Sequence, residues 1–312
     1  MSHPPGRIPA PVEAGNMPRH GERDISMPVI TSVINLKGGV GKTTITLALA
    51  HFLTIEHHKR VLVIDLDPQT NATVSLIPEM EWKARDESGR TLFQLFADQV
   101  KGSRRFHADD AIVRDVSNVG GGVTGLDLLP SSLGLIKIQD RVTQLTDFEH
   151  FSRGPIYGLR DALSDFLPYY DHVLIDCPPS LGIVTLNGLA ISNTYLIPVV
   201  PDILSVLGIP PILDRIDHFA SATRNNIRAL GIVISKIRMQ TILHNEMVQR
   251  LRDDFLARRF PLVFDTMIPE STRIAEAADV MAPIHTLQQK YGGGSYEAFS
   301  TLTREYLGHV AR

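Results

Sequence analysis

The sequence predicts a single α/β domain built on a doubly wound, mostly parallel sheet flanked by helices. Short runs rich in aliphatic and β-branched residues alternate with helical stretches along most of the 312 residues. The runs are almost continuously apolar, as expected of strands covered on both faces. A glycine-rich loop joins the first run to the first helical stretch, which is the arrangement of a phosphate-binding loop.

The predicted domain spans 28–312. Residues 1–27 hold five prolines and three glycines with little apolar periodicity, so they predict a flexible leader. The segment at about 78–125 is more polar and ends in three consecutive glycines, which indicates an insertion within the domain. We expect strands at 29–35, 61–65, 126–130, 172–176, 195–200, 230–235 and 263–267. We expect helices at 43–54, 91–100, 156–167, 182–191, 204–220, 241–260, 271–280 and 296–310.

Composition excludes several classes of protein. No apolar run approaches the ~20 residues that span a bilayer, so no integral membrane association is expected. The amino terminus has no secretory pattern, and the single cysteine, Cys177, cannot form an internal disulfide, so we expect a cytoplasmic protein. The net charge of −3 offers no global attraction to nucleic acid, so any such contact must be a local basic patch.

The phosphate-binding loop is the segment NLKGGVGKTT at 35–44. The glycines allow backbone N–H groups to surround a polyphosphate, and the helix that follows adds the positive end of its dipole. Lys42 is expected at the β- and γ-phosphates, and the Thr43 hydroxyl at Mg²⁺. The other loop residues expected to bind the nucleotide are Gly38, Gly39, Val40, Gly41 and Thr44.

This loop departs from the usual G-x-x-x-x-G-K-[ST] pattern. Its first glycine is replaced by Leu36, and a second lysine, Lys37, stands five residues before Lys42. A glycine-rich turn with two solvated lysines is the alternative reading. We favour the phosphate loop because glycine, lysine and threonine all match between a strand and a helix.

Three aspartates lie at the carboxyl ends of the strands that are expected beside this loop. Asp65 and Asp67 share one face at the end of the second strand, where the carboxyl edge of a parallel sheet meets its ligand. Asp176 ends another buried strand. Because Mg²⁺ is held by few protein groups and several waters, Asp176 and Thr43 are sufficient as its protein ligands. A solvated strand end is the alternative for the first two acids.

At these motifs the chain resembles the ParA/MinD family of deviant Walker A ATPases, whose loop reads K-G-G-x-G-K-[ST]. Residues 65–73 resemble the second family motif, D-x-D-P-Q-x-N-[AT], and the similarity extends over about 29–284. The closest match is to ParA/Soj-type partition ATPases. The resemblance implies that Lys37 reaches the nucleotide of a dimer partner, that Asp67 orients the attacking water, and that Pro269 contacts the nucleotide.

The resemblance also implies the cofactors ATP and Mg²⁺, an ATP-dependent homodimer, and a ParB-like adaptor that stimulates weak hydrolysis. The preference for adenine over guanine is implied only by the resemblance, and residues 235–238 lack the N-K-x-D pattern expected of GTPases. Nitrogenase iron proteins need two cysteines per subunit, which this chain lacks. Hydride-transfer enzymes would need G-x-G-x-x-G instead. Bacterial tyrosine kinases would need a clustered tyrosine tail, whereas the tyrosines here are dispersed.

The region 215–260 carries nine basic residues against four acidic ones and is the candidate DNA surface. Within the expected helix at 241–260, apolar residues recur every four positions and predict the core-facing stripe: Leu243, Met247, Leu251 and Phe255. By resemblance, the DNA-binding residues are Arg238, Arg250, Arg252 and Arg273. The family arginine before this helix aligns with Gln240, which is a departure. A solvated helix face is the alternative.

A MinD-like membrane switch is the competing function, positioning a protein complex rather than DNA. It would need a basic amphipathic helix at a terminus. The tail at 295–312 has two arginines opposed by two glutamates, so we expect it to pack on the domain instead. The expected function is therefore non-specific DNA binding by the nucleoid-associated ATP form, which positions a plasmid, chromosome locus or other cargo.

Overall fold

The computed structural model describes residues 27–138, 155–272 and 284–311, and in them all seven predicted strands form one sheet. The strand order is β3-β2-β4-β1-β5-β6-β7, and every neighbouring pair runs parallel. The strands are β1 (Val29–Val33), β2 (Val61–Asp65), β3 (Leu126–Leu129), β4 (His172–Asp176), β5 (Thr194–Val199), β6 (Arg228–Ile237) and β7 (Val263–Pro269). The predicted fold class is confirmed. The leader, except for Met27, lies outside the described residues.

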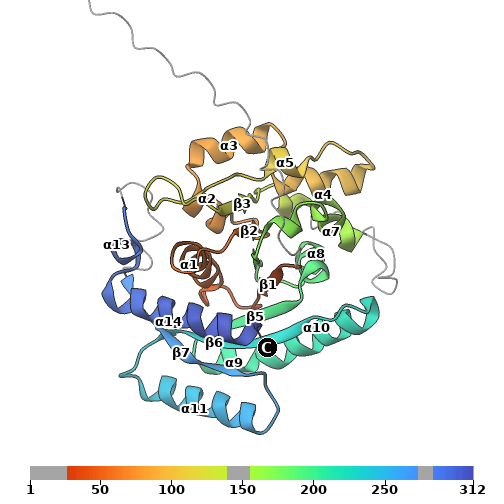
Figure 1. The fold of residues 1–312 in the computed structure, drawn as a ribbon. Coiled ribbons are helices and arrows are strands. Elements are labelled where there is room, and N and C mark those ends of the chain that lie inside the picture. The colour runs from red at the N-terminus through yellow and green to blue at the C-terminus, as the bar shows by residue number, and fades with distance from the viewer. Residues whose placement is uncertain (1–26, 139–154, 273–283, 312) are drawn as a thin grey trace, which may run out of the picture.

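Helices cover both faces of this sheet (Figure 1). One face packs against α1 (Lys42–Ile55), α2 (Asn71–Leu76), α3 (Glu79–Glu87), α13 (Leu287–Tyr291) and α14 (Gly293–Val310). The other packs against α4 (Leu92–Lys101), α5 (Ala108–Ala111), α7 (Gly158–Leu163), α8 (Ile183–Ile191), α9 (Ile203–Leu207), α10 (Ile209–Thr223), α11 (Ile242–Leu256) and the 3₁₀ turns η1 (Pro155–Tyr157) and η2 (Leu167–Tyr169).

The position of β1 decides where a ligand can bind. It lies between β4 and β5, so the chain leaves it toward one half of the sheet and later returns to build the other half. Such a reversal opens a crevice at the carboxyl ends of the strands. Val33 pairs with Asp176, which brings the acid at the end of β4 next to the loop that follows β1.

The helix predicted at 204–220 is two helices in the structure. α9 ends at Leu207, and α10 begins at Ile209 with Pro210 and Pro211 in its first turn. Proline has no N–H to donate and its ring clashes with the preceding turn, so it is tolerated at a helix start but not in its interior. The two prolines therefore begin a new helix. The helix predicted at 271–280 lies almost entirely outside the described residues.

The predicted core stripe of α11 is partly wrong. Leu251 is fully buried and Met247 and Phe255 are half-buried, but Leu243 is exposed and Val248 is buried in its place. Steps of four residues advance about 400° on a helix of 3.6 residues per turn, so a stripe with this spacing drifts off one face. Consequently the first turn of α11 points its apolar side chains outward.

The C-terminal helix packs on the domain, as predicted. Phe299, Leu302 and Tyr306 of α14 are fully buried against α1 and the sheet, and the Tyr306 hydroxyl lies 2.9 Å from the Thr31 hydroxyl on β1. The segment 78–125 also contributes core residues, among them Trp82 and Phe96. That it is an insertion stays a prediction. In the part of the chain described, no helix has both the length and the apolar character to cross a membrane.

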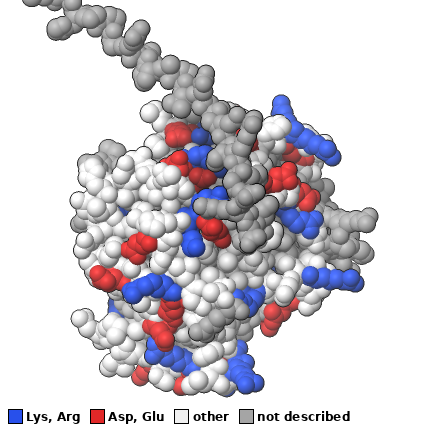
Figure 2. Space-filling view, viewed as in Figure 1, with Lys and Arg blue, Asp and Glu red and all other residues white. Residues whose placement is uncertain are grey.

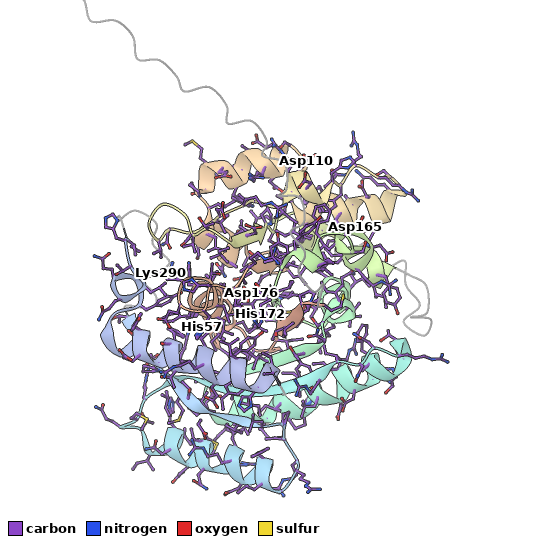
Figure 3. All side chains as sticks on the ribbon, viewed as in Figure 1. His57, Asp110, Asp165, His172, Asp176 and Lys290 are labelled. Carbon is purple, nitrogen blue, oxygen red and sulfur yellow. The ribbon has the colours of Figure 1, made fainter. Side chains whose placement is uncertain are left out.

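A buried histidine makes the fold sensitive to acid. His172, at the start of β4, lies near the centre of the molecule (Figure 3) with its Nδ1 3.3 Å from the Tyr306 hydroxyl. Burial lowers the pKa of His172 to about 4. The fold therefore favours the neutral ring, a stabilisation that is complete above pH ~6.5 and is lost as the pH falls toward 4.

We expect the free energy of unfolding to fall by up to about 3 kcal/mol between pH 6.5 and pH 4 on account of His172. Urea unfolding at several pH values measures this, and His172→Gln should flatten the pH dependence. His218→Gln, at an exposed position of α10, is the control and should leave the dependence unchanged. An equal acid sensitivity in His172→Gln and the parent would contradict the assignment.

Candidate nucleotide site

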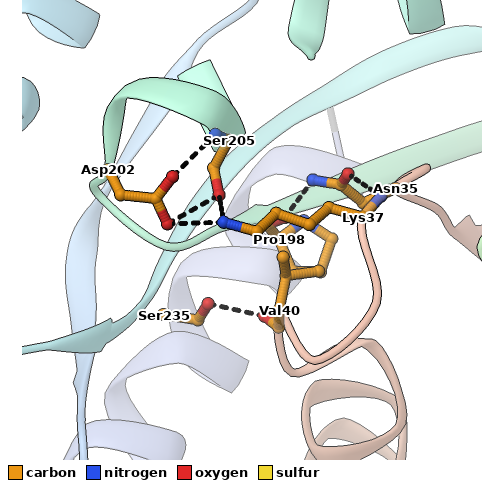
Figure 4. A network of polar contacts seen from close by, with 7 residues as sticks. All are labelled: Asn35, Lys37, Val40, Pro198, Asp202, Ser205 and Ser235. Carbon is orange, nitrogen blue, oxygen red and sulfur yellow. Dashed lines mark hydrogen bonds and ion pairs between the residues drawn. The ribbon is translucent and has the colours of Figure 1, made fainter. Parts of the chain in front are cut away.

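The loop between β1 and α1 adopts a conformation that only its glycines accommodate without strain. Gly39 and Gly41 have φ of 74° and 87°, in the left-handed region, and Gly41 caps the amino terminus of α1. The loop is fixed to the neighbouring strands because the Ser235 hydroxyl donates to the Val40 carbonyl at 2.6 Å (Figure 4). Its backbone N–H groups are thereby preorganised for an anion.

Lys42 lies buried inside this loop. Its Nζ donates to the Lys37 carbonyl at 3.1 Å, and only 7% of the residue is exposed. Burial lowers the pKa of Lys42, while the nearby carboxylates of Asp176 and Asp67 raise it. The site therefore combines one buried ammonium with two acids.

Thr43 and Asp176, the two predicted magnesium ligands, lie next to each other. The Thr43 hydroxyl donates to Asp176 Oδ2 at 2.6 Å, at the first turn of α1. Burial raises the pKa of Asp176 to about 7, although the hydrogen bond from Thr43 acts in the opposite direction. One hydroxyl and one carboxylate are hard oxygen donors that suit Mg²⁺ with its retained waters. The described residues contain no cluster of three or more His, Cys, Asp or Glu that would form an all-protein metal cage.

Asp65 and Asp67 have separate environments. Asp65 is fully buried and accepts hydrogen bonds from the Asp67 N–H and from both the N–H and the hydroxyl of Thr73. Asp67 instead lines a cavity next to the loop, and its Oδ1 accepts from the Gln69 N–H. Burial raises the pKa of both acids, and for Asp67 the charge of Lys42 opposes this rise. Asp67 is thus the acid that can face a ligand.

Two adjoining cavities form the crevice. The smaller has a volume of about 190 Å³ and the larger about 780 Å³, and both are bordered by Gly41, Thr43 and Thr44. The smaller one is lined by Gly38, Gly39, Gly41, Lys42, Thr43, Thr44, Asp67, Gln69, Asn71, Pro179 and Lys236. Polar backbone and ammonium groups around the small cavity suit a polyphosphate. The larger cavity suits a nucleoside.

The larger cavity has a mixed lining. Apolar groups come from Ile45, Leu47, Val74, Ile268, Pro269 and Tyr291, and polar ones include Ser235, Lys236, Arg238 and Glu270. Pro269, which is predicted to contact the nucleotide, lines this cavity. Gln69 and Asn71 belong to the second motif but were not predicted as site residues, and Lys236 near the end of β6 and Glu270 just after β7 belong to no motif used in the prediction. Their position at the carboxyl edge was the available signal.

Lys37 lies apart from both cavities. Its Nζ donates to Asp202 Oδ2 at 2.7 Å and to the Ser205 hydroxyl at 3.0 Å (Figure 4). Asp202 caps the amino terminus of α9, whose Leu204 is among the more exposed apolar side chains. Lys37 itself is partly exposed. The two loop lysines therefore point to different places.

The structure describes three of the four arginines predicted to bind DNA. Arg238 pairs with Glu270 and borders the larger cavity, while Arg250 is exposed and Arg252 half-buried on α11. Arg273 lies outside the described residues. Figure 2 shows acidic and basic side chains mixed over the lower part of the molecule, where Figure 1 places α11.

A parallel sheet with this loop, acid pair and terminal acid defines a P-loop nucleotide-binding protein. The model of a family described as an AAA domain matches residues 28–229. An uncharacterized protein of Mycobacterium tuberculosis is 30% identical over 305 residues, covering 97% of this chain and 84% of the relative. The chromosome-partitioning ATPase Soj of Treponema pallidum is 30% identical over 275 residues, 88% of this chain and 95% of that protein.

Among solved structures, cobyrinic acid a,c-diamide synthase from Mycobacterium smegmatis with bound ADP and magnesium has a TM-score of 0.68. It is 25% identical, and the match covers 91% of this chain and 96% of the synthase. The chain therefore belongs to the ParA/Soj-type ATPase family. The predicted family and enzyme class are confirmed, and so are ATP and Mg²⁺ as the cofactors that ATPases of this type use.

The different positions of the two lysines predict different effects on nucleotide affinity. We expect Lys42→Ala to weaken ATP binding at least 100-fold, because a charge-assisted contact to phosphate is lost inside a buried cavity. The affinity of Lys37→Ala for ATP should be within about threefold of the parent's, because the Lys37 ammonium is paired with Asp202 and does not face the cavity. Equilibrium binding of ATP with Mg²⁺ measures both, and an equal loss in the two variants would contradict the assignment.

Proposed function

We propose that the chain is an ATP-dependent dimerising switch that binds DNA non-specifically and positions a plasmid, chromosome locus or other cargo. The observation that carries this proposal is the placement of Lys37 at the surface beside α9, outside the cavities of its own subunit. A lysine on the phosphate loop that does not face its own cavity is available to the nucleotide of a second copy. The partition role is supported by the similarity to the chromosome-partitioning ATPase Soj of Treponema pallidum.

The apolar surface around Lys37 is consistent with such an interface. Ile203, Leu204 and Leu207 of α9 are each more than half exposed, and Leu36 beside Lys37 is 37% exposed. Burying them against a second copy would contribute about 1.5–3 kcal/mol per fully buried side chain. We infer a homodimer whose contact surface includes the mouth of the nucleotide site.

Hydrolysis in this proposal depends on five side chains. Lys42 and the loop N–H groups hold the β- and γ-phosphates, and Thr43 and Asp176 would hold Mg²⁺, which neutralises the developing phosphate charge when bound. Asp67 borders the phosphate cavity and would accept a hydrogen bond from the attacking water, aligning its oxygen with the γ-phosphate. Lys37 of the second copy would complete the charge around the phosphates.

In this proposal the intrinsic hydrolysis of ATP is slow. A ParB-like adaptor stimulates it and thereby ends the ATP-bound state of the dimer. The ATP form would then associate with the nucleoid through a surface that includes the exposed Arg250 of α11. The MinD-like alternative is less well supported. Its terminal membrane helix would need a free apolar face, whereas Phe299, Leu302 and Tyr306 of α14 are fully buried in the domain.

Asp67 and Lys37 variants should separate hydrolysis from dimerisation. We expect Asp67→Ala to bind ATP and accumulate as a dimer while turnover falls about 100-fold, because the water loses its orienting acceptor. Lys37→Ala should remain monomeric with ATP and also lose turnover. Sedimentation with ATP and a phosphate-release assay measure both properties. A parental rate in Asp67→Ala, or an ATP-dependent dimer in Lys37→Ala, would overturn the respective role.

DNA binding should require ATP and weaken steeply with salt. A dimer that contacts roughly six to eight phosphates should give a slope of about −5 to −7 for log K against log salt, and a monomer about half of that. Arg250→Ala with Arg252→Ala should weaken binding to all sequences alike and spare basal hydrolysis. Fluorescence anisotropy with random duplex DNA measures this.

The control for the DNA experiment is Arg104→Ala, at an exposed arginine in the loop after α4, which should not change affinity. Binding that does not depend on ATP would refute the switch. Association with anionic vesicles in place of DNA would favour the membrane alternative.

A further inference from the structure

Ser131 follows β3 and Pro130 directly in the chain. Its hydroxyl, N–H and carbonyl all form hydrogen bonds. It is fully buried. Its hydroxyl donates to the Asp67 carbonyl at 2.7 Å, and its N–H donates to the Thr73 hydroxyl at 3.0 Å. Its carbonyl accepts from Trp82 Nε1 at 3.0 Å. One residue thus joins the Asp67 loop, the start of α2 and helix α3.

The contacts of Ser131 hold a strained loop. Thr70 has φ of 58°, an unfavourable left-handed conformation for a β-branched residue that costs on the order of 1–3 kcal/mol. The Thr70 N–H and the Ser131 hydroxyl both donate to the Asp67 carbonyl. At the other end of the loop, the Thr73 hydroxyl donates to Asp65. The backbone around Asp67 is therefore fixed from both sides by buried groups.

Trp82 ties the segment 78–125 to this loop. It is the single tryptophan of the chain, and it is buried where α3 packs against α2 and the sheet. The Trp82 indole N–H donates to the Ser131 carbonyl, and the Ser131 hydroxyl donates to the Asp67 carbonyl. A displacement of α3 would therefore be transmitted to Asp67 through Ser131 alone.

We propose that Ser131 is a positioning residue for ATP hydrolysis: its hydroxyl fixes the Asp67 main chain so that the Asp67 carboxylate faces the phosphate cavity, and Trp82 supports Ser131 from α3. The inference depends on the proposed role of Asp67. It adds that the segment 78–125 is mechanically linked to turnover.

Ser131→Ala removes the hydroxyl alone, and Ser132→Ala is the matched control. Ser132 is equally buried, but its hydroxyl oxygen accepts from the Gly134 N–H in its own turn. We expect Ser131→Ala to lower kcat about 5- to 30-fold, the effect of losing one buried hydrogen bond that holds a reacting group in place. Affinity for ATP should stay within twofold, because the phosphate loop is untouched. Ser132→Ala should leave kcat within twofold.

Hydrogen exchange gives a readout that does not depend on catalysis. In Ser131→Ala, amides of the peptide covering 66–73 should exchange about tenfold faster, and in Ser132→Ala they should exchange at the parental rate. Trp82→Phe keeps the aromatic packing and removes the donor to Ser131, so it should give a smaller change in the same direction. It serves as the second variant if Ser131→Ala folds poorly.

The outcomes separate this inference from the proposed function. Faster exchange together with a lower kcat and unchanged ATP affinity supports it. Parental exchange in both Ser131→Ala and Trp82→Phe, or a parental kcat in a Ser131→Ala protein whose loop exchanges faster, overturns it. If Asp67→Ala itself retains turnover, the proposed role of Asp67 fails, and with it the link to hydrolysis, while the exchange data still decide whether Ser131 holds the loop.

Discussion

The hydrogen bond between Thr43 and Asp176 is the contact on which the arrangement of the site depends. It joins the first turn of α1 to the end of β4, so the glycine loop is held against the centre of the sheet. Asp176 is fully buried, and a buried carboxylate is costly unless nearby donors and positive charge compensate it. Thr43, Thr46 and the ammonium of Lys42 supply that compensation. A bound cation would add to it, which couples ligand binding to the local stability of the fold.

Around this contact the chain separates groups that hold the site from groups that face a ligand. Asp65, Ser235 and Asn35 have their polar atoms satisfied within the protein, and they fix the loop and the strand ends. Lys42 and Asp67 border the cavity instead. Burial disfavours the charged forms of Lys42 and Asp67. The attraction between the two charges opposes this effect, and it is stronger here than at the surface because the effective dielectric constant is lower. Asp65 at the end of β2 and Asp67 in the loop after it are only two residues apart, yet they lie in different environments.

The surface of the protein carries exposed apolar residues and charges of both signs. Exposed apolar residues gather on α9 beside Lys37 and at the first turn of α11, while the arginines of α11 are interspersed with acids. A dimer interface at the mouth of the nucleotide site would bury the exposed apolar residues of α9. The dimer would also carry two copies of α11. If this dimer forms on ATP and binds DNA as proposed, its two weak surfaces would act together, so the proposed DNA binding would depend on ATP.

Local sequence determined the order of elements and the nucleotide loop. A strand, a glycine turn and a helix are consecutive in the chain, so their chemistry needs no long-range information, and Lys42, Thr43 and the strand acids could be placed from spacing alone. Contacts between distant segments were decided only by the tertiary structure: Lys37 meets Asp202, and Ser131 meets Asp67. The core stripe of α11 was misjudged for a different, local reason: its four-residue spacing drifts off one face of the helix, so Leu243 is exposed and Val248 is buried. Hydrogen-bond partners far apart in the chain are chosen by strand order and helix packing, which no short pattern of residues encodes.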